Sequence, residues 1–222
     1  MGQTVSLTAK DGHRLDAYVA TPAGKPKGGL VVIQEIFGAN RHIRNVADRF
    51  AAMGYAAVAP ALFDRVQKSV DLGYDPESIA KGRALREKVS MDGSLADVQA
   101  AIDYAKQFGK VGVVGYCWGG SLAFLAATRL NGATAAVGYY GGMIAGHAGE
   151  KPKIPIILHF GDKDQSIPMS DVEKVKQARP DVPIYVYSAG HGFSCDERGA
   201  FDKTAHEQAL QRTTAFFKQH IG

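Results

Sequence analysis

The amino-acid sequence predicts an α/β fold, in which a mainly parallel, twisted sheet carries helices on both faces and has an antiparallel N-terminal edge. Short apolar runs alternate along the chain with helical patterns, which is typical of βα units. Several of these runs are continuously apolar, as expected of strands buried on both faces. No repeat, low-complexity tract or linker divides the 222 residues, so we expect a single domain over residues 1–222.

The first elements explain the antiparallel edge. Residues 4–8 and 14–20 alternate in polarity on either side of the turn dipeptide Asp11–Gly12, which predicts a β-hairpin. Apolar runs at 29–33 and 55–59 predict buried strands, and the helical spacing between them predicts a helix over 41–53.

The rest of the chain continues the alternation of helices and strands. The predicted helices cover residues 76–89, 92–108, 119–129, 170–178 and 203–220, and the predicted strands cover residues 110–115, 133–139, 154–160 and 182–187. Because strands and helices alternate along most of this part of the chain, neighbouring strands are expected to run mainly parallel.

Composition and charge exclude several classes of function. The 26 basic and 22 acidic residues give a net charge of +4 without a basic run, so we expect no nucleic-acid partner. No apolar stretch approaches the roughly 20 residues that span a bilayer, and the N-terminus lacks a secretory signal. The two cysteines, Cys117 and Cys195, do not make a disulfide framework. We therefore expect a cytoplasmic monomer that binds no membrane.

The segment Gly115–Gly120 (GYCWGG) has the pattern of a nucleophile elbow. It follows an apolar strand directly and opens a helix, and this turn presents the central residue above the sheet. At the helix N-terminus the thiol of Cys117 gains thiolate character, and the N–H of Trp118 is an expected oxyanion-hole donor. The alternative is that Cys117 is a small buried residue at a tight junction, but its pattern and context favour the nucleophile.

A thiol nucleophile needs a base and a group that orients the base. In elbow enzymes these partners follow the nucleophile in the order acid, then histidine. Asp164 lies in an acidic loop after the strand at 154–160, with Asp162 as the competing choice. His191 lies between two glycines just after the last strand, where a packing role is less expected than a catalytic one.

Glu35 ends an otherwise apolar strand, so two interpretations are open. Its carboxylate lies in the catalytic cleft, or it forms an ion pair at the strand end. Cys195 is likewise either a pocket residue or a small loop residue. The sequence has no Gly-rich phosphate loop and no His/Cys/Asp cluster at metal-ligand spacing, so we expect neither a cofactor nor a metal.

These motifs, together with Gln34–Gly38 (QEIFG), Gly138–Gly141 (GYYG) and Gly190–Phe193 (GHGF), resemble the dienelactone hydrolases, also called carboxymethylenebutenolidases. The resemblance covers nearly the whole chain and implies an α/β-hydrolase fold. It implies Cys117 as nucleophile, His191 as base and Asp164 as the orienting acid. The implied substrate is a small enol-lactone, which the thiolate opens to an acyl-enzyme that is hydrolysed to maleylacetate.

The resemblance also assigns roles to the loop after the strand at 29–33. It implies that Glu35 hydrogen-bonds the resting thiol and moves aside when substrate binds. It implies that the N–H groups of Ile36 and Trp118 form the oxyanion hole.

Two positions depart from the family pattern. The resemblance implies two arginines that bind the substrate carboxylate, as in the best-known members of the family. The first position, four residues after His191, holds Cys195, and an ungapped count places the second at Ile79. The basic residues that lie near these positions in the sequence are Lys81, Arg83, Arg86 and Arg198. The alternative function is therefore a cysteine-dependent esterase that acts on broader or neutral esters and lactones.

Overall fold

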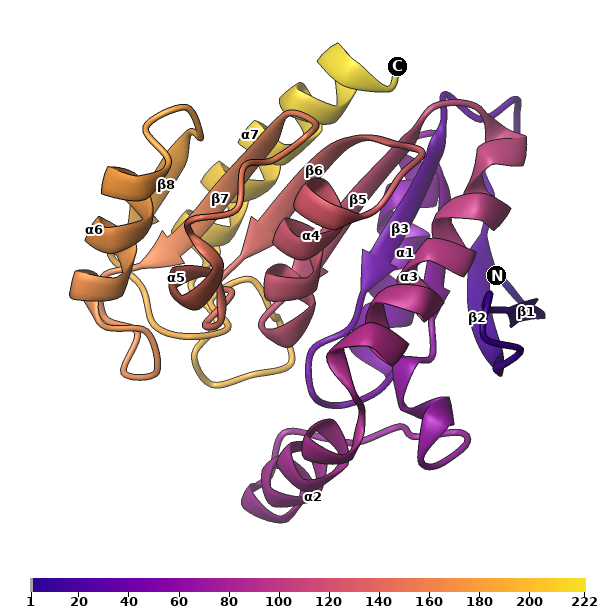
Figure 1. The fold of residues 1–222 in the computed structure, drawn as a ribbon, viewed down its shortest axis with the longest axis horizontal. Coiled ribbons are helices and arrows are strands. Elements are labelled where there is room, and N and C mark those ends of the chain that lie inside the picture. The colour runs from indigo at the N-terminus through magenta and orange to yellow at the C-terminus, as the bar shows by residue number, and fades with distance from the viewer. Residues whose placement is uncertain (1) are drawn as a thin grey trace.

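The computed structural model describes residues 2–222, so Met1, the first residue of the predicted domain, lies outside the described residues. The strands are β1 (Gln3–Thr8), β2 (Arg14–Ala20), β3 (Gly29–Ile33), β4 (Ala56–Pro60), β5 (Val111–Tyr116), β6 (Ala133–Tyr139), β7 (Ile156–Gly161) and β8 (Ile184–Tyr187). They form an eight-stranded sheet with the order β1-β2-β4-β3-β5-β6-β7-β8 (Figure 1).

The predicted antiparallel edge is confirmed. β1 pairs antiparallel with β2, and β2 pairs antiparallel with β4, whereas every pair from β4 to β8 is parallel. Every residue of β3, β4, β5 and β7 is buried, as their continuous apolar runs predict. The sheet is therefore mainly parallel with an antiparallel N-terminal edge, as the α/β prediction has it.

Helices cover both faces of this sheet. They are α1 (Arg41–Ala52), α2 (Pro76–Lys88), α3 (Met91–Ala105), α4 (Trp118–Arg129), α5 (Ile144–His147), α6 (Met169–Ala178) and α7 (Lys203–His220), with 3₁₀ turns η1 (Leu62–Arg65) and η2 (Lys106–Phe108). α1 and α7 share one face, where the rings of Phe50 and Phe217 lie 6.3 Å apart. α3, α4, α5 and α6 lie on the other face, each in contact with the next (Figure 1).

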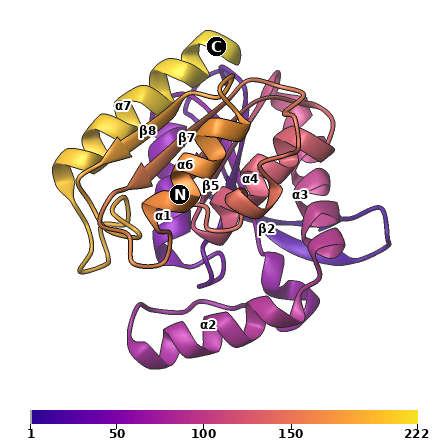
Figure 2. The same cartoon turned by 60° about the vertical axis from the view of Figure 1, so that its left-hand side comes forward.

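Helix α2 lies apart from both layers. It extends along one side of the molecule, away from the sheet (Figure 2). Asp75 caps its first turn by accepting a hydrogen bond from the N–H of Ser78 at 2.9 Å. A Cβ at Gly82 would collide with the carbonyl oxygen of Ile36, so this glycine lets α2 approach the loop that follows β3.

The remaining differences from the sequence prediction are local. β7 and β8 each begin two residues later than predicted, directly after Pro155 and Pro183, which have no N–H for the strand ladder. The short elements η1 and α5 were not predicted because a single turn shows no periodicity. Among the helices of residues 2–222, none has both the length and the apolar character needed to cross a bilayer.

Candidate active site

Cys117 occupies a strained turn between β5 and α4. Its backbone has φ 55° and ψ −115°, a conformation that residues with a Cβ rarely adopt. Side chains at the neighbouring glycines would not fit: a Cβ at Gly115 would collide with the carbonyl of Gly119, and one at Gly119 with the carbonyl of Ile33. The glycines therefore allow the close strand and helix packing that the elbow pattern predicts.

His191 lies between Cys117 and Asp164. Its Nε2 is 3.1 Å from the sulfur of Cys117, and its Nδ1 is 2.7 Å from Oδ2 of Asp164. Burial by itself lowers the pKa of His191, but the hydrogen bonds with Asp164 and Cys117 outweigh it and raise the pKa to about 10. A thiol bonded to an imidazole that a carboxylate orients can perform nucleophilic catalysis.

The structure distinguishes the two aspartates that the sequence left open. Asp164, whose side chain is 1% exposed, bonds His191, whereas Asp162 is exposed. The second oxygen of Asp164, Oδ1, accepts hydrogen bonds from the N–H groups of Ser166 (2.8 Å) and Ile167 (3.1 Å). These bonds fix the orientation of the carboxylate that holds the imidazole.

Topology explains why these three residues meet. Cys117 follows β5, Asp164 follows β7 and His191 follows β8. These strands belong to one parallel run of the sheet, so their carboxyl ends lie along the same edge. The order of the strands thus brings together residues that are up to 74 positions apart in sequence.

Glu35 is buried and makes two polar contacts beside this site. Its Oε1 accepts a hydrogen bond from Nη1 of Arg198 at 3.1 Å, and its Oε2 accepts one from the hydroxyl of Tyr74 at 3.2 Å. The thiol of Cys117 is instead bonded to His191. The structure therefore differs from the resting contact between glutamate and thiol that the family resemblance implies, and it has the ion pair that the sequence left open.

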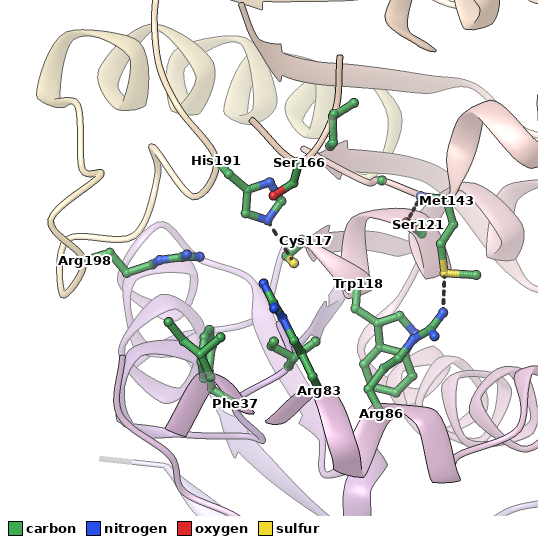
Figure 3. Close-up of a pocket in the computed structure, with 14 residues that line it drawn as sticks. Phe37, Arg83, Arg86, Cys117, Trp118, Ser121, Met143, Ser166, His191 and Arg198 are labelled. Carbon is green, nitrogen blue, oxygen red and sulfur yellow. Dashed lines mark hydrogen bonds between the residues drawn. The ribbon is translucent and has the colours of Figure 1, made fainter. Parts of the chain in front are cut away.

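A cavity of about 350 Å³ opens in front of the thiol (Figure 3). Cys117 and His191 line it together with Ile36 and Trp118, whose N–H groups are the expected oxyanion-hole donors. Other lining residues are Phe37, Ile79, Ser121, Gly142, Met143, Ser166 and Ile167. Cys195 is fully buried and is not among the lining residues, so it is a loop residue packed behind the site.

Three arginines make this mostly apolar cavity basic. Arg83 and Arg86 come from α2, and Arg198 comes from the loop after β8. Arg83 and Arg198 extend toward the space beside Cys117, whereas Arg86 donates a hydrogen bond to the sulfur of Met143 at 3.0 Å (Figure 3). Ile79 lines the cavity one helical turn before Arg83.

Sequence reasoning missed one residue of the site. Tyr74 bonds Glu35, but it lies in the loop before α2, where no local pattern marks it. Tyr139 and Tyr140 of the GYYG motif are fully buried and are not among the lining residues. Both cysteines are free thiols.

Comparison with known proteins gives a consistent result. Residues 15–221 match the family described as the dienelactone hydrolase family. A carboxymethylenebutenolidase of Pseudomonas putida is 33% identical over 96% of this chain and 94% of that protein. A protein of Azospirillum brasilense, provisionally named a carboxymethylenebutenolidase, is 37% identical over 98% of this chain and 99% of that protein. The structure of a Klebsiella pneumoniae protein, provisionally described as a dienelactone hydrolase, superposes with a TM-score of 0.86, 29% identity and 99% coverage of both chains.

Proposed function

The chain belongs to the dienelactone hydrolase family, and we propose that it hydrolyses enol-lactones such as dienelactone, with Cys117 as nucleophile, His191 as general base and Asp164 as the orienting acid. Membership of this family makes the protein a hydrolase of carboxylic esters or lactones. The observation that carries the proposal is the continuous series of hydrogen bonds from Cys117 through His191 to Asp164.

The first half of the proposed reaction forms an acyl-enzyme. With the thiol proton of Cys117 held on Nε2 of His191, the sulfur attacks the lactone carbonyl carbon. The N–H groups of Ile36 and Trp118 stabilise the negative charge on the carbonyl oxygen. The carbon–oxygen bond of the ring then breaks, and the enol oxygen that leaves takes up the proton, which opens the ring into a thioester.

The second half regenerates the thiol. His191, neutral again, takes a proton from a water molecule as that water attacks the thioester carbonyl. The carbon–sulfur bond breaks, and the sulfur recovers the proton from His191. Asp164 keeps Nδ1 of the imidazole protonated throughout, so Nε2 is available as the base. The product of dienelactone is maleylacetate.

The proposed substrate carries a carboxylate, and the cavity offers cations to bind it. Arg198 lies three residues after Cys195 and takes the role of the arginine that the family resemblance implies there. Arg83 lies one turn after Ile79 on α2 and takes the role of the second implied arginine. A guanidinium binds a carboxylate through two parallel hydrogen bonds, which fixes the orientation of the lactone as well as its affinity. Lys81 is exposed and is not among the lining residues, so we assign it no part in binding.

The test is a comparison of kcat/KM for cis- and trans-dienelactone with that for the neutral ester p-nitrophenyl acetate. We expect dienelactone to be preferred, Cys117→Ala to abolish turnover with an unchanged circular dichroism spectrum, and His191→Ala to lower kcat by several orders of magnitude. Turnover by Cys117→Ala would overturn the nucleophile. Hydrolysis of the neutral ester alone would reject the enol-lactone substrate in favour of the broader esterase.

A further inference from the structure

Three buried side chains of metal-binding type meet behind the cavity, and one of them is Glu35, the ion-pair partner of Arg198. Glu35 follows β3, His42 lies in the first turn of α1, and Cys195 lies in the loop after β8. Each offers one ligand atom, and these atoms all lie within 4.8 Å of one another. Each residue is at most 1% exposed. The group therefore combines a carboxylate oxygen, an imidazole nitrogen and a sulfur in one enclosed place.

The imidazole of His42 has an unused nitrogen. Its Nδ1 lies 3.2 Å from Oδ1 of Asp196, and its Nε2 is one of two buried side-chain nitrogen or oxygen atoms in residues 2–222 that have no hydrogen-bond partner. Buried polar atoms almost always have a partner, so an unpaired one needs an explanation. Because Asp196 also pairs with Arg49 it is a charged acceptor, which favours the proton on Nδ1 and a free lone pair on Nε2.

This arrangement matches the surroundings of metal-binding histidines. Such a histidine usually donates its second ring N–H to a carboxylate, which fixes the tautomer and makes the other nitrogen a better ligand. Asp196 therefore stands where a carboxylate partner of a metal ligand is expected.

We propose that Glu35, His42 and Cys195 form a binding site for a divalent transition-metal ion, with Zn²⁺ as the best match. Zn²⁺ binds this mixture of sulfur, nitrogen and oxygen donors, and three protein ligands leave a fourth position for water. On binding, the S–H bond of Cys195 breaks, a metal–sulfur bond forms and the proton leaves to solvent.

The geometry requires only a small adjustment. Around tetrahedral Zn²⁺ the ligand atoms lie roughly 3.3–3.8 Å apart, so separations of up to 4.8 Å need to close by about 1 Å. Glu35 already accepts hydrogen bonds from Arg198 and Tyr74. A carboxylate has about four acceptor positions, so Glu35 retains room for a metal ion.

Sequence reasoning predicted no metal site, and the proposal departs from that prediction for a topological reason. Glu35 and His42 come from the N-terminal part of the chain, whereas Cys195 comes from the C-terminal loop. Metal-ligand spacing searches detect ligands that are close in sequence, and only the fold brings these three together.

The test uses full-length, tag-free protein carrying Cys117→Ser, because Cys117 and His191 form a second thiol–imidazole pair that also attracts metals. The chain has two cysteines, so any thiolate–metal absorption in this variant comes from Cys195. The protein is titrated with Co²⁺, and its near-ultraviolet thiolate-to-metal band and visible tetrahedral bands are recorded. We expect saturation at one Co²⁺ per chain and displacement by Zn²⁺.

Further variants in the same background identify the ligands. Adding Cys195→Ser removes the thiolate band, and adding His42→Gln raises the Kd for Co²⁺ tenfold or more. Adding Asp196→Asn, which changes a partly exposed carboxylate, raises the Kd about 10- to 100-fold. His206→Gln is the matched control and leaves the Kd unchanged. His206, on α7, hydrogen-bonds Ser194 next to Cys195, but it is not one of the proposed ligands.

Two results would overturn the proposal. One is the absence of a thiolate band in the Cys117→Ser protein with a native circular dichroism spectrum, which would leave the group as a hydrogen-bonding cluster only. The other is a band that persists after Cys195→Ser. If Cys195→Ser does not fold, an unchanged Kd in both His42→Gln and Asp196→Asn overturns it instead. Because the background variant lacks the proposed nucleophile, these results are independent of the hydrolase reaction.

Discussion

Arg198 forms an ion pair with Glu35, with Nη1 of the arginine 3.1 Å from Oε1 of the glutamate. The arginine lines the substrate cavity, whereas the glutamate is buried behind it. Glu35 therefore holds a cation at the cavity wall, and the arginine stacks above the rings of Phe37 and Tyr74, 5.7 Å and 5.6 Å from their centres. This pair links an N-terminal strand end to a C-terminal loop and fixes the position of the guanidinium at the cavity.

Replacing Arg198 should weaken binding of anionic substrates specifically. A charge-assisted hydrogen bond contributes about 1.5–3 kcal/mol, so Arg198→Gln should raise KM for dienelactone by roughly ten- to a hundredfold. kcat/KM for p-nitrophenyl acetate should change by about twofold or less, because a neutral ester does not need the cation. Steady-state kinetics on both substrates measures the difference.

The control for Arg198→Gln addresses the carboxylate that the substitution leaves unpaired. Removing one partner of a buried ion pair is strongly destabilising, so thermal unfolding of Arg198→Gln should occur at a lower temperature. The double variant Arg198→Gln/Glu35→Gln should regain much of this stability but retain the high KM for dienelactone. Equal losses on the neutral and the anionic substrate would contradict a role in carboxylate binding.

Helix α2 offers a matched pair for a second prediction. Arg83 and Lys81, two residues apart on the same helix, are both exposed, but only Arg83 lines the cavity. Arg83→Gln should raise KM for dienelactone about tenfold, and Lys81→Gln should leave it within about twofold. Both substitutions remove one positive charge, so a similar increase in both would show that net charge, rather than a local contact, attracts the substrate.

Much of this site could be predicted from the sequence, because Cys117 and His191 each follow a strand between glycines, and the loop after the strand at 154–160 offers few acidic side chains. The buried apolar runs likewise predicted the parallel strands. The partner of Glu35 was not predictable, because Arg198 lies 163 residues away and only the fold brings the two together. The choice between Asp162 and Asp164 depended on one loop conformation, in which the N–H groups of Ser166 and Ile167 orient Asp164. Periodicity carries no information about such conformations.

The two thiols should differ sharply in reactivity. Cys117 is partly exposed at the cavity, whereas Cys195 is fully buried, and burial together with the charge of Glu35 raises the pKa of Cys195 to about 12. Iodoacetamide at pH 7.5 should therefore label one thiol in the native protein and two after denaturation. Mass spectrometry should locate the native label on Cys117, and native Cys117→Ser should remain unlabelled. Rapid native labelling of Cys195 would contradict its burial.

His159 should make the stability of the protein depend on pH. This residue is fully buried in β7, where Nδ1 lies 2.8 Å from the hydroxyl of Tyr187 and Nε2 lies 3.2 Å from that of Thr213. Burial, together with the positive charge of Arg212, lowers the pKa of His159 from 6.5 to about 3. Between these two values the unfolded chain binds a proton that the folded protein does not. Stability is therefore fully present above pH 6.5 and falls as the pH decreases toward 3.

A glutamine at this position tests that argument, because its amide can still hydrogen-bond the two hydroxyls but does not titrate. His159→Gln should be less stable than the unmodified protein at pH 7. Its disadvantage should shrink by roughly 1.4 kcal/mol for each pH unit between pH 6 and pH 4, as the unmodified protein loses stability faster. Urea unfolding at several pH values measures both curves, with His220→Gln on the last turn of α7 as the control for loss of a histidine.

Parallel curves for the unmodified protein and His159→Gln would show that His159 does not titrate in this window. Some pH dependence should remain in His159→Gln, because burial also lowers the pKa of His42 and His206.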